Sequence, residues 1–213
     1  MPPVVSIVGK SESGKTTILE RLVEELKSRG YQVATIKHAP HGTTFDEPRK
    51  DSWRHIKAGS RAVVVSSPDN IALVKPVSRD SPLEEIVRLL GEDYDIILTE
   101  GFKQEGAPKI EVHRKGTGPL LENIRKRIAI VTDEPLESKA RQFSFEDIGN
   151  MADLLERGFI KPQKKRVCLY VNNAPVTLTT FPKQIITNVV VAMASCLKGV
   201  REISSLQIFV RKE

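Results

Sequence analysis

Short apolar runs alternate with helix-like patterns along the first three quarters of the chain. Apolar runs stand at residues 4–8, 32–37, 95–99, 109–113 and 128–132. Between them, apolar positions recur at helical spacing from Thr17, from about Ser81 and from Ser144. The run at 95–99 carries apolar residues on both faces, as in the middle of a parallel sheet. This alternation predicts a three-layer α/β fold, with a mostly parallel sheet flanked by helices.

One internal segment departs from this alternation. Residues 51–59 read as a short helix that a glycine ends. Residues 61–66 and 70–74 then read as two strands, and Ser67-Pro68-Asp69 between them is typical of a turn. The segment is therefore predicted to add a short helix and a β-hairpin to the sheet.

The last quarter of the chain follows another pattern. A linker at 160–165 separates a first domain, residues 1–159, from a small module at residues 166–213. The module reads as a strand at 167–171, a strand at 176–178, an amphipathic helix at 182–197 and a last strand at 205–210. We expect this β-β-α-β module to pack on something, because a unit of about fifty residues is marginal alone.

Composition narrows the class of protein. At 39% hydrophobic and 28% charged residues, the chain has an ordinary globular composition. Its apolar runs are all much shorter than the roughly 20 residues that span a bilayer, so we expect no membrane segment. The first strand begins too early for a signal peptide to precede it. Cys168 and Cys196 lie far apart and outside any metal-binding spacing, which favours a reduced, cytoplasmic protein.

The net charge of +6 comes from the end of the chain. Residues 1–159 hold 24 Lys and Arg against 25 Asp and Glu, whereas residues 160–213 hold 9 against 2. The basic run of Lys161, Lys164, Lys165 and Arg166 has no interleaved aromatic residues, so we expect no nucleic-acid partner. The run reads either as a solvated linker or as a docking patch for an anionic ligand or an acidic partner.

A phosphate-binding motif stands between the first strand and the first helix. It has the spacing G-x-x-x-x-G-K-[ST] in its required strand–loop–helix context. Small residues let backbone N–H groups surround phosphate oxygens, and the helix N-terminus adds partial positive charge. The predicted nucleotide-binding residues are Gly9, Lys10, Ser11, Glu12, Ser13, Gly14, Lys15, Thr16 and Thr17.

Two residues of the motif and one residue from elsewhere in the chain complete the expected chemistry. Lys15 is predicted to act on the β- and γ-phosphates, and Thr16 to bind Mg²⁺ through its hydroxyl. Glu100 directly follows a buried strand, so we expect it to hold Mg²⁺ and to position the attacking water, with Lys15 and Glu100 as the catalytic pair. Asp46, in the polar loop 38–50, is a further candidate for the metal's surroundings.

Other polar residues have two readings each. Asp51 is either near the metal or the cap of its helix. His38 and His41 are candidate metal ligands or polar loop residues, since no third His or Cys is near them. Asp133 follows the strand at 128–132 and either accepts hydrogen bonds from guanine or caps its loop before Pro135.

These residues together resemble the family of molybdopterin-guanine dinucleotide biosynthesis protein B, P-loop GTPases of molybdenum cofactor synthesis. The resemblance covers about residues 3–158, and its most specific elements are Lys50-Asp51-Ser52-Trp53 and Thr99-Glu100-Gly101-Phe102-Lys103. The other elements are Ser13-Gly14-Lys15-Thr16-Thr17, Ile36-Lys37-His38, Phe45-Asp46, Ala58-Gly59-Ser60, Pro108-Lys109-Ile110 and Val131-Thr132-Asp133.

The resemblance implies a homodimer that binds GTP with Mg²⁺ and hydrolyses it slowly. It implies a partnership with the guanylyltransferase of the molybdenum cofactor, and with molybdopterin or its guanine dinucleotide. Lys10 resembles a lysine that reaches across a dimer to the partner's nucleotide. The basic segment 160–213 lies outside the resemblance and would suit an anionic pterin dinucleotide or an acidic partner; unchanged binding after its deletion would refute this.

Two other classes remain as alternatives. An ATP-dependent small-molecule kinase would need an Arg-rich lid, for which Arg125-Lys126-Arg127 is the candidate. A metal-insertion GTPase chaperone should carry Cys and His pairs at ligand spacing, and the sequence has none. An arginine that stabilises phosphoryl transfer is not evident near the motif; Arg54, Arg61 or a partner residue are the candidates.

Overall fold

The computed structural model describes residues 1–40, 42, 50–163, 167–172, 174–203, 206–208 and 210. His41 and Asp46, two of the residues singled out in the sequence, lie outside the described residues, as does most of the basic run at 164–166. The chain divides into two compact units, residues 1–163 and residues 164–213. Each is described here by itself.

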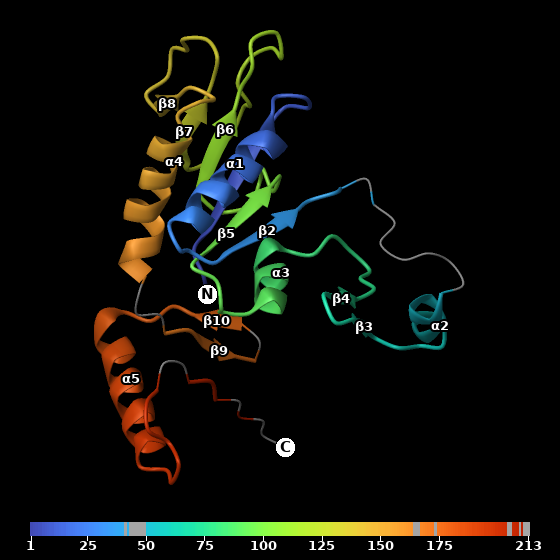
Figure 1. Ribbon diagram of the computed structural model, residues 1–213, viewed down its shortest axis with the longest axis vertical. Coiled ribbons are helices and arrows are strands. Elements are labelled where there is room, and N and C mark those ends of the chain that lie inside the picture. The colour runs from blue at the N-terminus through green and yellow to red at the C-terminus, as the bar shows by residue number, and fades with distance from the viewer. Residues whose placement is uncertain are drawn as a thin grey trace. The chain divides into compact units, whose positions relative to one another are not determined.

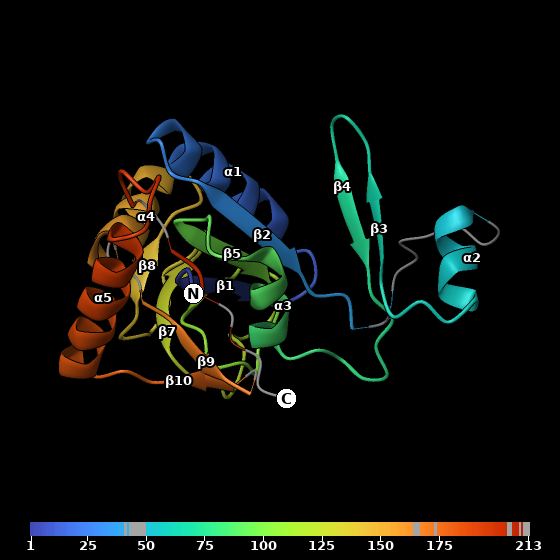
Figure 2. The ribbon, with the colours of Figure 1, turned by 90° about the horizontal axis from the view of Figure 1, so that it is seen from below.

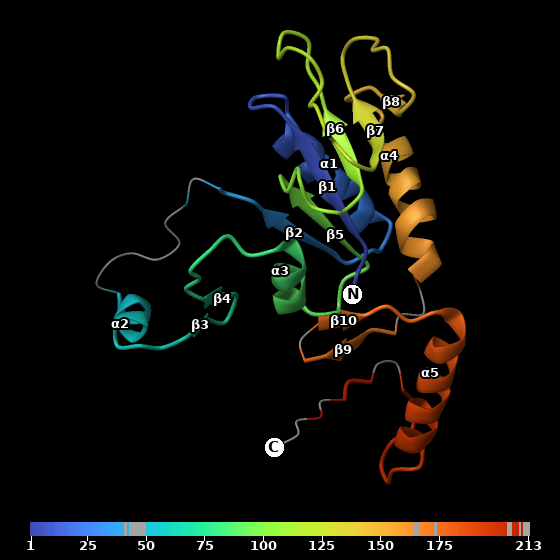
Figure 3. The ribbon, with the colours of Figure 1, turned by 180° about the vertical axis from the view of Figure 1, so that it is seen from behind.

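The first unit is built on a six-stranded sheet in the order β2-β5-β1-β6-β7-β8 (Figure 1). Every neighbouring pair in it is parallel, so the predicted parallel sheet is confirmed. Seen from behind, β1 lies in the middle, between β5 and β6 (Figure 3). The strands are β1 (Val4–Gly9), β2 (Val33–Lys37), β5 (Ile96–Glu100), β6 (Lys109–Val112), β7 (Arg127–Val131) and β8 (Arg141–Phe143).

The register of the central strands determines what meets at one edge of the sheet. β1 pairs with β5 so that Ile7 lies beside Glu100, and with β6 so that Gly9 lies beside Val112. β2 pairs with β5 so that Lys37 lies beside Glu100. The carboxyl ends of four strands therefore lie at one level, which is where ligands bind in open α/β sheets.

Helices cover both faces of the sheet. On one face, α1 (Lys15–Ser28) and α4 (Ile148–Leu155) bury Ile18, Leu22 and Met151 in a large apolar core. On the other, α3 (Leu83–Leu90) packs Leu83 and Val87 against a smaller core. Figure 2 shows α1 and α3 on opposite sides of the strands. The three-layer prediction is thereby confirmed.

Among the described residues, the segment between β2 and α3 contributes to neither core. It holds α2 (Asp51–Lys57), which has no buried residue, and the antiparallel pair β3 (Val63–Ser66) and β4 (Ile71–Val74). The predicted hairpin is confirmed. None of the residues 50–82 belongs to either apolar cluster.

The end of the first unit differs from the expected linker. α4 continues into a π-helical turn at Glu156–Ile160 and a 3₁₀ turn at Lys161–Gln163. Ile160 is buried in the larger core, so the chain stays helical past residue 159. The reason is that Ile160 continues the apolar face of α4.

The second unit contains two short strands and one long helix. β9 (Leu169–Val171) and β10 (Ala174–Val176) form an antiparallel pair, and α5 spans Thr180–Ser195. The last strand predicted at 205–210 is not found, because the described residues 206–208 and 210 lie outside any strand. The apolar residues there favour a strand, but a strand also needs a neighbour to pair with. No helix in the described part of the chain is long and apolar enough to cross a membrane.

Candidate functional site

The loop between β1 and α1 is shaped by two glycines. Gly9 ends β1 so close to β6 that a Cβ there would lie 2.3 Å from the carbonyl oxygen of Val112. Gly14 precedes α1 with φ of 92°, a left-handed conformation that favours glycine. No acidic residue occupies the first turn of α1. The loop therefore meets the helix N-terminus as a backbone cradle suited to an anion.

Polar groups of this loop point to phosphate as its ligand. The Ser13 hydroxyl is fully buried and has no hydrogen-bond partner among the residues that the structure describes. Lys15 Nζ donates to the carbonyl oxygen of Lys10, 2.5 Å away. Because a buried polar group without a partner is costly, the Ser13 hydroxyl fits a site that is completed by a ligand.

Charges around Lys15 favour an anionic ligand. Burial lowers the pKa of the Lys15 ammonium, the nearby Glu100 carboxylate opposes that shift, and the charges of Lys103 and Lys37 lower the pKa further. The three ammonium groups of Lys15, Lys37 and Lys103 therefore lie near enough for the other two to repel that of Lys15. A phosphate would relieve this repulsion.

Thr16 and Glu100 come together as the sequence predicted. The Thr16 hydroxyl donates to Glu100 Oε2 at 3.0 Å, and Lys37 Nζ lies 3.9 Å from the same oxygen. Glu100 is held at this place by the sheet, since its carbonyl oxygen accepts the backbone N–H of His38. A hydroxyl and a carboxylate are oxygen ligands of the kind that Mg²⁺ prefers. The pair therefore fits the metal that accompanies nucleoside triphosphates.

On the other side of the loop, three segments rise from β6, β7 and β8. Asp133 accepts the backbone N–H of Lys115 at 2.7 Å, so one carboxylate oxygen ties two of these segments together. His113, which is buried, lies 2.8 Å from Glu134 through its Nε2. A Cβ on Gly118 would lie 3.0 Å from Nζ of Lys10. In this structure the Lys10 side chain therefore lies beside a residue of the same chain.

Two residues that the sequence did not single out lie against the phosphate loop. A Cβ on Gly14 would be 3.2 Å from the ring of Phe145 and 3.5 Å from Nη2 of Arg114. Cζ of the Arg114 guanidinium lies over the Phe145 ring, 4.7 Å from its centroid. Their positions in the sequence could have indicated them, because each follows a strand whose carboxyl end faces the loop, where ligands bind.

The remaining candidates have other partners. His38 lies 2.8 Å from Asp80 and its ring stacks on Phe102, with centroids 4.5 Å apart. Asp51 begins α2 without capping it and accepts Arg54 Nη1 at 3.1 Å. In the described ranges, no three His, Cys, Asp or Glu side chains are grouped so that they could hold a metal ion.

Arg127, considered above as part of a kinase lid, is tied to the sheet instead. Its Nε lies 2.7 Å from the buried Glu111, and its Nη2 donates to the carbonyl oxygen of Leu121. These contacts hold its side chain between β6 and β7. Arg127 therefore serves the packing of two strands and is not available to a lid.

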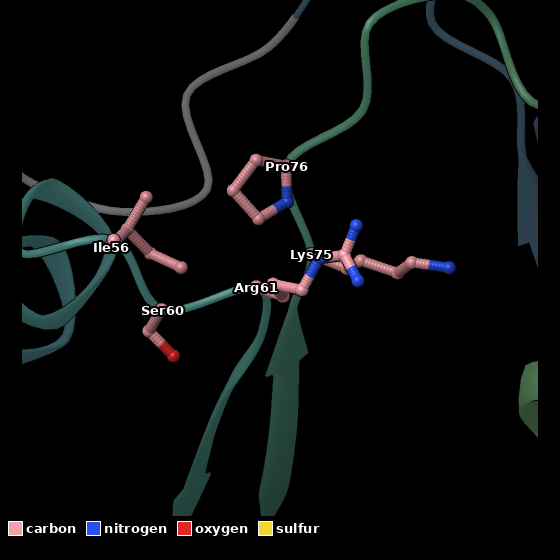
Figure 4. Close-up of a pocket in the computed structure, with 6 residues that line it drawn as sticks. Ile56, Ser60, Arg61, Lys75 and Pro76 are labelled. Carbon is pink, nitrogen blue, oxygen red and sulfur yellow. The ribbon is translucent and has the colours of Figure 1, made fainter.

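One open hollow lies away from the phosphate loop. It has a volume of about 640 Å³ and separates the end of α2 from the base of the β3–β4 hairpin. Arg61, Lys75 and Pro76 stand at the hairpin's base, with Ile56 and Ser60 on the side of α2 (Figure 4). None of the residues predicted to bind nucleotide lines it.

Comparisons with known proteins agree on one family. The family described as molybdopterin guanine dinucleotide synthesis protein B matches residues 4–133. A molybdopterin-guanine dinucleotide biosynthesis adapter protein of Haemophilus influenzae is 40% identical over 159 residues, which cover 72% of this chain and 88% of that protein. The protein of the same name from Escherichia coli is 34% identical over 161 residues, covering 73% and 92%.

Solved structures give the same result for the fold. A crystal structure of molybdopterin-guanine biosynthesis protein B has a TM-score of 0.60 and 31% identity, covering 73% of this chain and 99% of that one. A Bacillus subtilis structure has a TM-score of 0.58 and 28% identity, covering 74% and 98%. The shared part corresponds to the first unit.

Proposed function

The chain belongs to the molybdopterin guanine dinucleotide synthesis protein B family, and from that premise we propose that it is an adapter in molybdopterin guanine dinucleotide biosynthesis. We propose further that it works as a GTP-binding protein with weak GTPase activity. The observation that carries this is the phosphate loop, with its unpartnered Ser13 hydroxyl and its Thr16–Glu100 pair.

The residues of the loop have distinct roles in this proposal. Backbone N–H groups of residues 10–17 and the Ser13 hydroxyl hold phosphate oxygens. Lys15 exchanges the Lys10 carbonyl for the β- and γ-phosphates, and its fixed positive charge offsets the charge that develops during transfer. Thr16 and Glu100 would hold Mg²⁺, which when bound neutralises phosphate charge. Asp46, outside the described residues, stays a candidate near the metal.

We expect GTP hydrolysis to be slow because few side chains near the phosphate loop can orient an attacking water molecule. Glu100 is the carboxylate closest to the Thr16 hydroxyl and can orient a water molecule. The same carboxylate lies 3.9 Å from Lys37 Nζ, which competes with a water molecule for that oxygen. We therefore propose that nucleotide state, rather than rapid turnover, is what partners of the protein sense.

Guanine preference is assigned to Asp133. One of its oxygens accepts the N–H of Lys115, which orients the carboxylate at the carboxyl end of β7. A carboxylate can accept several hydrogen bonds, so Asp133 can also accept the N1–H and N2–H groups of guanine. Adenine offers no such pair of donors.

We propose that the protein is a homodimer and that the β3–β4 hairpin carries the contact. The register places Val64, Ile71 and Leu73 on one face of the hairpin, and all three are exposed. A two-stranded sheet is marginally stable alone. A second copy of the hairpin is the simplest cover for this face.

Two further assignments follow from the family. The guanylyltransferase of the molybdenum cofactor is the proposed protein partner, and molybdopterin or its guanine dinucleotide the proposed ligand. The basic charge of residues 160–213 suits an anionic ligand or an acidic partner. A reduced, cytoplasmic setting stays a prediction from the two cysteines, both of which are exposed.

The first test is nucleotide binding with Mg²⁺, measured by calorimetry for GTP, GDP and ATP. We expect GTP to bind in preference to ATP, and Lys15→Ala to weaken GTP roughly 100-fold, because a charge-assisted contact to phosphate is lost. Lys27→Ala is the matched control, since Lys27 is exposed at the other end of the same helix. A preference for ATP would favour the kinase alternative, and an unchanged affinity in Lys15→Ala would contradict the proposed site.

A further inference from the structure

The Thr16–Glu100 pair determines which way a bound nucleotide must run. In the proposed function, the metal and the terminal phosphate lie on the side of β5 and β2, where Thr16 and Lys37 approach Glu100. β1 lies between β5 and β6, so the opposite side of the loop faces β6, β7 and β8. Figures 1 and 3 show the loops after β6 and β7 at the same end of the sheet as the phosphate loop. The rest of the nucleotide therefore extends toward these loops.

Arg114 and Phe145 are the side chains that stand there. Both approach Gly14, the residue that directly precedes Lys15 and the start of α1. Phe145 is half-buried against the larger core, whereas Arg114 is exposed. The guanidinium of Arg114 lies over the ring of Phe145, while Arg114 as a residue stays exposed to solvent.

Neighbouring contacts hold this pair in place. Arg21 of α1 donates to the carbonyl oxygen of Phe145 at 2.8 Å and pairs with Glu146 at 2.8 Å. The carbonyl oxygen of Arg114 accepts both the N–H and the hydroxyl of Thr117. The backbone on either side of the stack is thus anchored before any ligand binds. Such preorganisation lowers the entropy that binding costs.

We propose that Arg114 and Phe145 form the stacking wall for the purine base of the nucleotide. A planar guanidinium stacks on aromatic rings, and a base has a π-face on which it can lie. The base then completes a three-layer stack of Phe145, Arg114 and purine, next to Asp133 at its edge. The wall accounts for affinity toward any purine, and Asp133 for the choice of guanine. This inference rests on the proposed nucleotide binding.

The wall is tested by comparing a nucleotide with a ligand that lacks a base. Calorimetry measures Mg²⁺-GTP and Mg²⁺-tripolyphosphate on the full chain and on Arg114→Ala, Arg114→Lys and Phe145→Leu. Arg141→Ala is the matched control, because Cζ of Arg141 lies over the Phe143 ring at the same 4.7 Å, and Arg141 is not among the atoms nearest to a Cβ on Gly9 or Gly14. Melting temperatures verify that each variant is folded.

We expect Arg114→Ala to weaken GTP about 10-fold and tripolyphosphate less than about 2-fold, since stacking is lost and phosphate contacts stay. Arg114→Lys keeps the positive charge but lacks the planar guanidinium. It should therefore lose most of the GTP affinity that Arg114→Ala loses. Equal losses for both ligands would make Arg114 a phosphate contact and overturn the wall. Unchanged GTP binding in Arg114→Ala would overturn it too. Failure of the unaltered chain to bind either ligand is a different result, which would refute the proposed function itself.

Discussion

Gly9 shows how closely the backbone packs at the phosphate loop. Its neighbour across the sheet is the carbonyl of Val112, which a Cβ would approach to 2.3 Å. The contact is with backbone, which cannot move without disturbing β6. The glycine is thus required by the pairing of β1 with β6 as well as by the phosphate that the loop is proposed to bind.

We predict that Gly9→Ala destabilises the protein by about 1–3 kcal/mol, the usual cost of forcing a methyl group into a packed site. The free energy of unfolding from urea titration measures the effect. Gly106→Ala is the control, since Gly106 has no positive φ and nothing lies within 4 Å of its Cβ position. Equal stability of the two variants would contradict the steric argument.

At the scale of elements, α1 and α4 are joined by one arginine. Arg29, at the end of α1, pairs with Glu25 of its own helix and with Asp153 and Glu156 on the α4 side. Lys161 adds a contact to Glu156 at 2.6 Å. The hydrogen bond from Lys161, and after it that from Arg29, lowers the pKa of Glu156 from 4.5 to about 2.

This lowered pKa predicts a pH dependence of stability. Below pH 4.5 the unfolded chain takes up a proton on Glu156, while the folded protein keeps the carboxylate down to about pH 2. The contribution is therefore fully present above pH 4.5 and is lost as the pH falls toward 2. We expect the melting temperature of Glu156→Gln to fall less steeply across this window than that of the unaltered chain. Glu84→Gln, an exposed carboxylate on α3, is the control and should leave the slope unchanged.

At the scale of the whole molecule, the two cores account for only part of the chain. Among the described residues, all their buried members lie within residues 5–160, and none lies in the segment 50–82. Exposed apolar side chains gather instead on the β3–β4 hairpin. Within the first unit the hairpin thus leaves an apolar surface uncovered, which is typical of proteins that associate.

We predict that Ile71→Lys weakens the dimer, because it places a charge on the apolar hairpin face where the side chain is now 76% exposed. Sedimentation equilibrium measures the effect, with an expected rise of at least roughly 10-fold in the dimer dissociation constant. Asp69→Lys, in the exposed hairpin turn, adds a lysine off that face and is the control. A monomeric unaltered chain, or an equally stable dimer in both variants, would contradict the assignment to the hairpin.

Strands, helices and the phosphate loop were predictable because their signals are local. Apolar spacing identifies a buried strand or a helix face, and eight consecutive residues contain the whole loop motif. Glu100 was predictable for a similar reason, since it directly follows the most apolar strand. β8 was missed because only Phe143 of its three residues is buried, so no alternation marks it.

The sequence by itself therefore determined the parallel α/β class, the phosphate cradle and its acidic partner, all of which depend on short-range patterns. Only the tertiary structure decided which distant side chains complete the cradle. Arg114 and Phe145 lie a hundred or more residues beyond Gly14, and sheet order brings them against it. It also decided that Arg127 packs on Glu111 and that residues 206–208 find no partner strand. Pairing and contact depend on where other segments lie, which no local pattern encodes.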